Sequence, residues 1–279
     1  MNEQIEPRSI VVAVDGSEHA DRALHWAAEQ AVLEHRPLAV VAVGDDSGAI
    51  AEEGVATARG LHPGLAPRAL ALPGDPREVL LDLSERAGVL VLGSRGRGAI
   101  KSMLLGSVST ALSAHAACPV VVCRPSSGGS SGAGVVVGVD ATAESVPVIE
   151  FAYRQAALRG QPLTVLHCFW DAVAAVAEYR QARGEAVDAP ELEELRAVVA
   201  QSVAGFAADY PDVQVTVGLQ HGLVDEALSG RDQAWDLIVV GRHPMTSLGR
   251  VLTGSIATSV VERARTTVAV VPESAPTSS

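Results

Sequence analysis

The sequence predicts two tandem α/β domains, each an open, mostly parallel sheet of five strands with helices on both faces. Three observations predict this fold: an internal duplication, short valine-rich runs, and amphipathic stretches between those runs. The segment SIVVAVDGSEHADRALHWAAEQAVLEHRPLAVVAV, which starts at Ser9, returns as GVVVGVDATAESVPVIEFAYRQAALRGQPLTVLHC from Gly134. Further matching pairs start at Gly74 and Gly222, and at Gly106 and Gly254. Because the matches keep the same order along the chain, a whole folding unit is repeated.

Each repeat alternates two patterns of apolar residues. In the first repeat the candidate strands, nearly continuous apolar runs, are residues 10–14, 38–43, 89–92 and 120–123. Such runs are typical of strands buried on both faces of a parallel sheet. Residues 20–33 and 77–86 instead space their apolar side chains three and four apart, as helices that cover a sheet do. The alternation therefore predicts strand–helix crossover units.

A Gly- and Ser-rich stretch separates the repeats. RPSSGGSSGAG, residues 124–134, has the composition of a flexible tether, and its proline ends the preceding strand. We expect a first domain at residues 1–124, a linker at 125–134, a second domain at 135–273 and a polar tail at 274–279.

The repeats differ between their second and third strands, where the second repeat has a longer interval, 169–212, than the first, 45–67. The longer interval carries a helical stripe of apolar residues, Leu192, Leu195, Val199 and Phe206. Loop lengths favour an ordinary crossover helix here, and a functional lid is the alternative.

The composition excludes several classes of protein. With 48% hydrophobic and 19% charged residues, the chain has enough apolar surface to fold, which excludes wholesale disorder. The net charge of -12 argues against nucleic-acid binding, which depends on an excess of Lys and Arg. No run approaches the roughly 18 apolar residues of a membrane span, and no signal sequence precedes the first strand. We expect a cytoplasmic protein without membrane contact.

The cysteines and histidines do not form a recognisable metal pattern. Cys118, Cys123 and Cys168 are too few and too irregular for a disulfide framework or a zinc site. The histidines lack paired ligand spacing, so no metal site is expected from protein side chains.

Ligands of open parallel sheets bind beyond the carboxyl ends of the strands, and three segments at those ends indicate a phosphate site. Asp15 follows the first strand, Gly93-Ser94-Arg95-Gly96 follows the fourth, and Gly106-Ser107-Val108-Ser109 begins the last helix. We expect Gly93 and Gly96 to adopt positive φ and to approach an anion closely. The free amides of the helix start, with the hydroxyls of Ser107 and Ser109, can donate to phosphate oxygens.

Simpler interpretations exist for the same residues. Asp15 alone is better explained as a turn residue before a helix than as a ligand contact, and a lone glycine-rich loop is weak evidence. Arg95, Arg97 and Lys101 add positive charge to an acidic protein, although Arg97 is equally a solvated surface charge. The fixed distance from the glycine loop to Gly106 favours the phosphate site.

This spacing, Gly93, two residues, Gly96, nine residues, Gly106 and then Ser107, resembles the ATP-binding signature of the universal stress protein family. The whole chain is similar to tandem members of that family, and Cys118-Pro119 stands in the expected place before the last strand. The resemblance implies the adenine nucleotide alpha hydrolase-like fold. It also implies ATP as ligand, with Mg²⁺ or Mn²⁺ bridging the phosphates and few direct protein ligands to the metal.

The resemblance further assigns contacts by position. Asp15 would accept a hydrogen bond from the base, and Val43 would offer it an apolar contact. The ribose and phosphates would be contacted by Gly93, Arg95, Gly96, Gly106, Ser107, Val108 and Ser109.

The second repeat departs from the signature. Pro244 stands where the first repeat has Gly96, which fixes φ and removes an amide donor. His243 replaces Arg95, and Ala257 replaces Ser109. A weaker second ATP site is therefore expected at most, formed by Asp140, Gly241, His243, Gly254, Ser255 and Ile256.

Other nucleotide motifs are absent. The chain has no Gly-Lys-Ser or Gly-Lys-Thr, and its first strand–helix turn, Asp-Gly-Ser-Glu-His, lacks the glycines of a dinucleotide-binding site and the pyrophosphate loop of nucleotide-activating transferases. No residue is placed as nucleophile or general base. We expect no enzyme activity beyond slow ATP hydrolysis.

The leading hypothesis is therefore a nucleotide-responsive regulator in stress adaptation with an unknown protein partner. The alternatives are an interaction module of the same fold without nucleotide, and a weak ATPase. The last strands of the two repeats, residues 120–123 and 268–271, are apolar and lie at sheet edges, and such unpaired edges pair with other strands. In the family, domains pair through this strand, so we expect an intrachain pseudo-dimer and a further homodimer.

Overall fold

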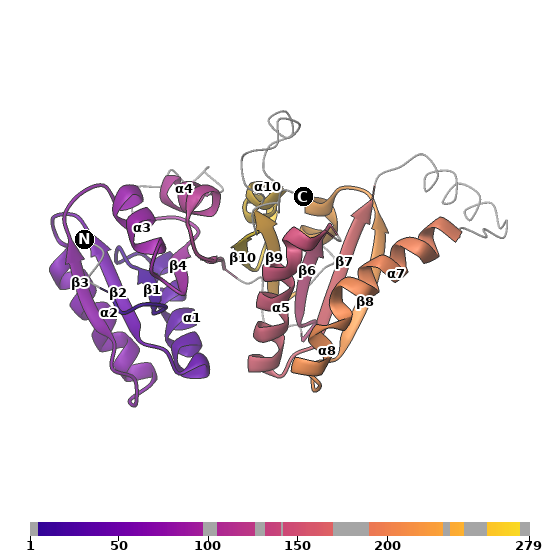
Figure 1. Cartoon of the computed structure of the whole chain (residues 1–279). Coiled ribbons are helices and arrows are strands. Elements are labelled where there is room, and N and C mark those ends of the chain that lie inside the picture. Colours follow the sequence, from indigo (N-terminus) through magenta and orange to yellow (C-terminus); the bar gives the residue numbers. More distant parts are fainter. Residues whose placement is uncertain are drawn as a thin grey trace.

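The computed structural model describes residues 5–96, 105–125, 132–140, 142–169, 190–230, 235–242 and 256–273. Within these residues the chain forms one ten-stranded sheet in the order β3-β2-β1-β4-β5-β10-β9-β6-β7-β8 (Figure 1). Each repeat contributes five strands in the same relative order, and β5 and β10 meet in the middle. The predicted α/β fold class is confirmed.

The first repeat alternates strands and helices as the valine runs predict. Its elements are β1 (Ile10–Ala13), α1 (Glu18–Glu34), β2 (Leu38–Val43), α2 (Ser47–Leu61), β3 (Arg68–Leu72), α3 (Pro76–Ser84), β4 (Val89–Gly93), α4 (Ser107–His115) and β5 (Val120–Cys123). All of its strand pairs are parallel. Val11 and Val12, which point to opposite faces, are both fully buried, because helices cover both sides of the sheet.

The second repeat follows the same plan. Its elements are β6 (Val135–Val139), the 3₁₀ turn η1 (Ala143–Ser145), α5 (Val146–Arg159), β7 (Leu163–Phe169), α7 (Pro190–Ala204), α8 (Phe206–Asp209), β8 (Val215–His221), α9 (Val224–Ser229), β9 (Leu237–Arg242), α10 (Ile256–Arg263) and β10 (Thr267–Pro272). Its strand pairs are again parallel.

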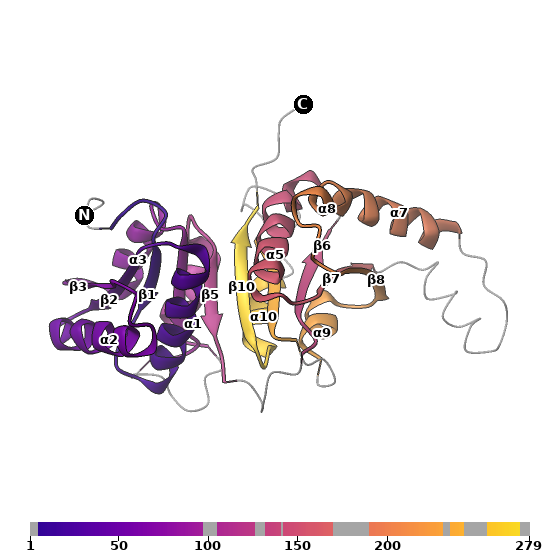
Figure 2. The ribbon, with the colours of Figure 1, turned by 90° about the horizontal axis from the view of Figure 1, so that it is seen from below.

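One antiparallel pair joins the two halves. Val121 of β5 lies opposite Ala269 of β10, and Figure 2 shows the two strands side by side at the centre of the molecule. Two layers of core side chains run across this seam, one on each face of the sheet. Helices α1, α2, α5 and α7 contribute to one layer, and α3, α4, α9 and α10 to the other.

The described part of the longer interval in the second repeat is a crossover helix. Val199 and Val203 of α7 are buried in the core, and the rings of Phe206 and Tyr153 stack with centroids 5.3 Å apart. For residues 190–209 the structure therefore agrees with an ordinary crossover rather than a lid. Residues 170–189 lie outside the described residues. None of the helices in the described ranges is long and apolar enough to span a membrane.

Candidate functional site

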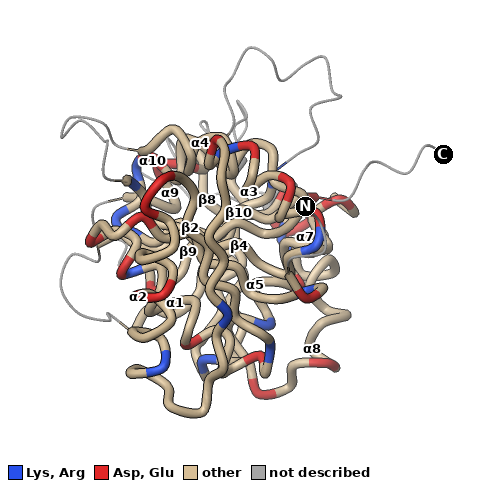
Figure 3. The backbone as a smooth tube through the Cα atoms, turned by 90° about the vertical axis from the view of Figure 1, so that its left-hand side faces the viewer, with Lys and Arg blue, Asp and Glu red and all other residues tan. Residues whose placement is uncertain are grey.

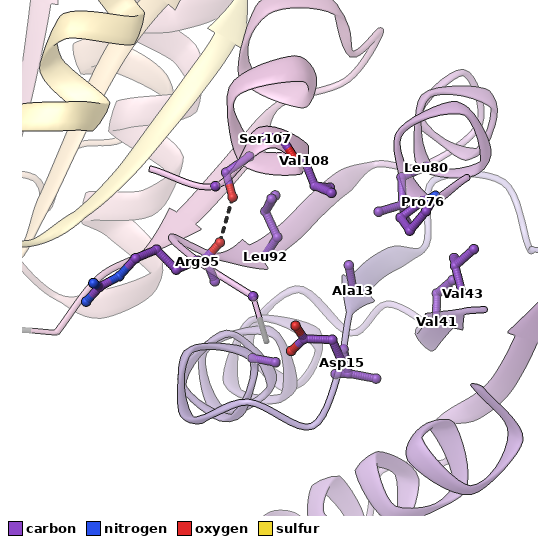
Figure 4. Close-up of a pocket in the computed structure, with 16 residues that line it drawn as sticks. Ala13, Asp15, Val41, Val43, Pro76, Leu80, Leu92, Arg95, Ser107 and Val108 are labelled. Carbon is purple, nitrogen blue, oxygen red and sulfur yellow. Dashed lines mark hydrogen bonds between the residues drawn. The ribbon is translucent and has the colours of Figure 1, made fainter. Parts of the chain in front are cut away.

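A pocket of about 370 Å³ opens at the carboxyl ends of β1, β2 and β4. This is the place where the strand order reverses, since β2 lies on one side of β1 and β4 on the other. Figure 4 shows side chains from α3, α4 and the strand ends pointing into it. Every residue that the sequence analysis assigned to the first site lines this pocket: Asp15, Val43, Gly93, Arg95, Gly96, Gly106, Ser107, Val108 and Ser109.

One wall of the pocket is apolar, and sequence reasoning had found only part of it. Besides Val43, it contains Ala13, Val41, Pro76, Leu80 and Leu92. Pro76 and Leu80 come from α3, which begins directly beyond the end of β3 at the same edge of the sheet. The dipeptide Asp75-Pro76 was the available signal, because Asp caps a helix and Pro favours its first turn. The Asp75 carboxylate does accept a hydrogen bond from the Arg77 amide at 2.8 Å.

Asp15 is a turn residue before α1, and it also lines the pocket. Its Oδ1 accepts hydrogen bonds from the Ser17 amide at 3.1 Å and from the Ser17 hydroxyl at 2.6 Å. Ser17 in turn caps α1, where its Oγ accepts a hydrogen bond from the Ala20 amide at 3.3 Å. The turn thus holds the Asp15 carboxylate at the edge of the pocket, with its orientation fixed.

The expectation of positive φ at Gly93 and Gly96 is wrong, since neither is among the glycines with positive φ. Glycine is needed at these positions because neighbouring atoms leave no room for a Cβ. A Cβ on Gly93 would lie 2.6 Å from the backbone carbonyl of His19, and one on Gly96 would lie 2.6 Å from Oδ2 of Asp15. The two glycines let the loop after β4 pack against the start of α1.

The start of α4 offers free amide groups to the pocket. Gly106 is the N-cap residue, and no side chain caps this helix. The Gly106 amide donates to the Ser94 carbonyl at 2.8 Å, which fixes the helix start against the loop after β4. Since the first amides of a helix have no partner within it, this end favours an anion.

The two serines of α4 have different roles. Ser109 is buried, and its hydroxyl donates to the Gly93 carbonyl at 2.8 Å. Its single proton is therefore committed, and the expected donation from Ser109 to a phosphate is not supported by this geometry. Ser107 is exposed at the mouth of the pocket. Of the two serines, Ser107 is thus the one whose side chain is exposed at the pocket.

Arg95 lines the pocket and is half-buried, but its guanidinium extends away from the other lining side chains (Figure 4). Behind the loop, His19 Nδ1 lies 2.9 Å from Arg22 Nη2 and 3.3 Å from the Ser94 hydroxyl. Burial lowers the pKa of His19, and the charges of Arg22 and Arg95 lower it further. His19 is therefore neutral at pH 7 and supports the loop. Arg97 and Lys101 lie outside the described residues.

The second repeat keeps the turn after its first strand but changes its surroundings. Asp140 accepts hydrogen bonds from the Thr142 amide and hydroxyl and from the Ser145 hydroxyl, at 3.0, 2.7 and 2.6 Å. Gly241 is in direct contact with the carboxylate of Glu273, which follows β10. A negative charge therefore lies where the first repeat has the peptide backbone of α1.

Of the remaining residues expected in the second site, only Ile256 lies within the described residues. Ile256, at the start of α10, is 51% exposed, and Ala257 beside it is buried. His243, Pro244, Gly254 and Ser255 lie outside the described residues. The Asp140, Gly241 and Ile256 positions alone do not establish a second nucleotide site.

Comparison with known proteins agrees with this architecture. The model of the family described as "Universal stress protein family" matches twice, at residues 7–124 and 134–272. The chain belongs to the universal stress protein family.

Curated relatives of similar length belong to the same family. Universal stress protein Rv2005c of Mycobacterium tuberculosis is 29% identical, with 98% of this chain and 100% of the relative covered. Universal stress protein Rv2623 of the same organism is 30% identical, with 95% and 96% covered.

Solved structures support the fold over nearly the whole chain. A universal stress protein from Archaeoglobus fulgidus matches with a TM-score of 0.64 and 21% identity, covering 95% of this chain and 96% of that one. A functionally unknown protein from Pseudomonas aeruginosa matches with a TM-score of 0.67 and 19% identity, covering 96% and 93%.

Proposed function

We propose that the first repeat of this universal stress protein binds ATP, and that occupancy of the pocket regulates its contacts with a protein partner during stress adaptation. The observation that carries the proposal is the convergence of three distant segments on one pocket. The turn at Asp15, the loop at Gly93–Gly96 and the uncapped start of α4 all line it. The proposal places the protein in the cytoplasm, where ATP is abundant.

The pocket fits the parts of an adenine nucleotide. The apolar wall of Val41, Val43 and Leu80 suits a base, and Asp15 at its edge can accept a hydrogen bond from an amino group. The free amides at the start of α4 and the exposed hydroxyl of Ser107 suit phosphates. These two regions lie at opposite ends of the pocket, as a nucleotide requires.

A bridging Mg²⁺ or Mn²⁺ is compatible with this arrangement. Asp15 is the only carboxylate among the described lining residues, and its Oδ1 is already used by Ser17. The described protein residues would therefore supply few ligands, and the phosphates and water would supply the rest. The ion would neutralise phosphate charge, while this chain holds the nucleotide.

The site favours binding over catalysis. Universal stress proteins are generally not classical enzymes. Among the described lining residues, no histidine, cysteine or second carboxylate is present to act as a base or nucleophile. ATP hydrolysis, if measured, should be slow, and the alternative of a weak ATPase is tested by turnover of the wild type against Asp15→Ala.

The other alternative is an interaction module that carries no nucleotide. Mass spectrometry of small molecules released from the purified protein separates the two functions. ATP at close to one equivalent per chain supports the proposal. Protein that neither retains ATP nor binds it in a calorimetric titration with Mg²⁺ would leave the interaction module as the better explanation.

Assembly is part of the proposal. Strands β5 and β10 already pair within the chain, so a homodimer must use another surface. Light scattering with and without ATP would show whether the protein is a dimer and whether occupancy changes its assembly.

A further inference from the structure

A second pocket, of about 390 Å³, lies at the seam between the repeats. One side consists of segments that precede the strands of the first repeat, including Arg8, Arg36 and Gly88. The other side consists of α5 and the end of β10, including Glu150 and Arg154. In the first repeat these residues precede the strands, whereas the nucleotide pocket lies where the strands end, so the two pockets are separate.

Two of the arginines in this seam pocket share one buried carboxylate. Glu34, whose side chain is only 4% exposed, lies 3.0 Å from Arg36 Nη1 and 3.4 Å from Arg154 Nε. Its Oε1 also accepts a hydrogen bond from Gln30 at 2.7 Å. Within the described part of the chain, neither guanidinium makes another hydrogen bond or ion pair. Because each guanidinium has five N–H donors, most of these donors remain available.

Positive charge is in excess here, although the protein as a whole is acidic. Among the described lining residues, Arg8, Arg36 and Arg154 stand against one carboxylate, Glu150, and Glu34 pairs with Arg36 and Arg154, in a chain of net charge -12. Figure 3 shows that Lys and Arg positions are otherwise interspersed with acidic ones on the face it presents. Burial lowers the pKa of Arg36; Glu34 opposes this, and Arg154 and Arg8 lower the pKa further. The like charges are therefore close enough to repel one another.

Near these arginines, the backbone at Gly88 packs closely against the backbone at Arg8. A Cβ on Gly88 would clash first with the backbone carbonyl of Arg8 and would also lie 2.6 Å from Arg36 Nη1, so glycine lets these two segments pack closely here. Arg8 has a left-handed φ of 63° and is held there by its amide, which donates to the Arg86 carbonyl at 2.7 Å. His35, with a φ of 52°, ends α1, whereas Arg8 ends no helix. Such strained residues gather at functional sites.

We propose that the seam pocket binds a small phosphate-bearing anion, held by Arg8 and Arg36 of the first repeat and Arg154 of the second. Guanidinium groups match phosphate oxygens with paired, charge-assisted hydrogen bonds. The anion relieves the repulsion among the arginines that Glu34 alone leaves uncompensated. Because the site draws on both repeats, its occupancy strengthens their docking, independently of ATP in the first repeat.

Titration of the full-length protein with inorganic phosphate at constant ionic strength, followed by calorimetry, tests the proposal. One saturable site is expected. Arg8→Gln and Arg36→Gln each weaken it about tenfold or more, because each removes a charged hydrogen bond. Glu34→Gln strengthens it, because the competing carboxylate is gone. Arg59→Gln, an exposed position on α2, leaves it unchanged.

Further titrations identify which pocket binds phosphate and which class of anion it accepts. The Gly106→Glu variant, which alters the nucleotide pocket, retains phosphate binding if the seam is the site. Glycerol 3-phosphate in place of inorganic phosphate shows whether an ester is accepted, and citrate tests for a carboxylate site instead.

Several outcomes would overturn the proposal. These are the absence of a saturable event, equal affinity in Arg8→Gln and Arg36→Gln, loss of binding in Gly106→Glu, or binding of citrate but not phosphate. Arg8 is exposed, so its variant should fold even if the others do not. If Glu34→Gln leaves phosphate affinity unchanged, the arginines only hold the seam together, and the site is not there.

Discussion

The two repeats share one architecture and differ in the crevice at the carboxyl ends of their strands. In both, an aspartate after the first strand accepts hydrogen bonds from the start of the next helix. In the first repeat, Gly93 packs against the backbone of His19, and Arg95 lines the pocket. In the second, Gly241 packs against the carboxylate of Glu273. The duplicated halves thus keep the same backbone, but the second has a carboxylate where the first has uncharged peptide backbone, and a negative charge there disfavours an anion.

The largest expected effect separates the two crevices directly. Gly106→Glu should weaken ATP binding about 100-fold or more, because it places a carboxylate at the helix start that would face the phosphates. A Cβ at Gly106 has no neighbour closer than 3.5 Å, so the fold should tolerate a side chain there. The matched change Gly254→Glu in the second repeat should leave ATP affinity, measured by calorimetry, unchanged. Equal losses in both variants would show that the crevices are equivalent.

A second prediction concerns how one repeat supports the other. Arg242, at the end of β9, donates to the Ala114 carbonyl at 2.8 Å and to the Ala116 carbonyl, at the carboxyl end of α4. Arg242→Gln should lower the free energy of unfolding by about 2 kcal/mol, as expected for charged hydrogen bonds at a helix end. Urea denaturation measures this, with Arg59→Gln as the exposed control. An unchanged unfolding midpoint would mean that α4 does not depend on the second repeat.

Ser109 and Ala257 offer a smaller contrast at matching positions. Ser109→Ala removes the hydrogen bond to the Gly93 carbonyl and should cost about 1 kcal/mol of stability. Its effect on ATP affinity should be modest, since its proton is not available to a phosphate. Thermal unfolding and calorimetry on the same sample distinguish the two effects. A large loss of affinity without loss of stability would restore Ser109 as a phosphate ligand.

The smallest expected effect is pH dependence at the first crevice. The pKa of His19 is lowered in the folded protein, so its contribution to stability is present above the ordinary value of 6.5 and is lost as the pH falls through the folded value. Unfolding midpoints at pH 7 and pH 5 should therefore differ slightly more in the wild type than in His19→Gln. If the unfolding midpoint changes by the same amount between pH 7 and pH 5 in both proteins, the pKa of His19 makes no measurable contribution to stability.

Much of the fold was predictable because local patterns and the duplication agree. Valine-rich runs such as Ile10–Ala13 and Val120–Cys123 form buried strands, so this pattern identified them, whereas the more exposed β3, Arg68–Leu72, was not among the predicted strands. Pro76 and Leu80 show the limit. The Asp75-Pro76 step indicates the start of a helix, but only the packing of α3 over β1 and β2 brings these two side chains into the pocket.

The roles of individual polar groups were also beyond sequence. Ser109 carries the same hydroxyl as Ser107, yet burial of Ser109 commits its proton to a carbonyl. The glycines of the loop after β4 were expected from backbone conformation, but the neighbours of their missing Cβ atoms explain them.

The sequence by itself determined the duplication, the spacing of the glycine motif and most strands and helices, because these depend on residues near one another in the chain. Only the tertiary structure decided which groups from distant segments share a site. It placed Glu273 against Gly241 and gathered Arg8, Arg36 and Arg154 at the seam. The physical reason is that charge and hydrogen bonding act between neighbours in space, and for these residues the folded sheet sets those neighbours.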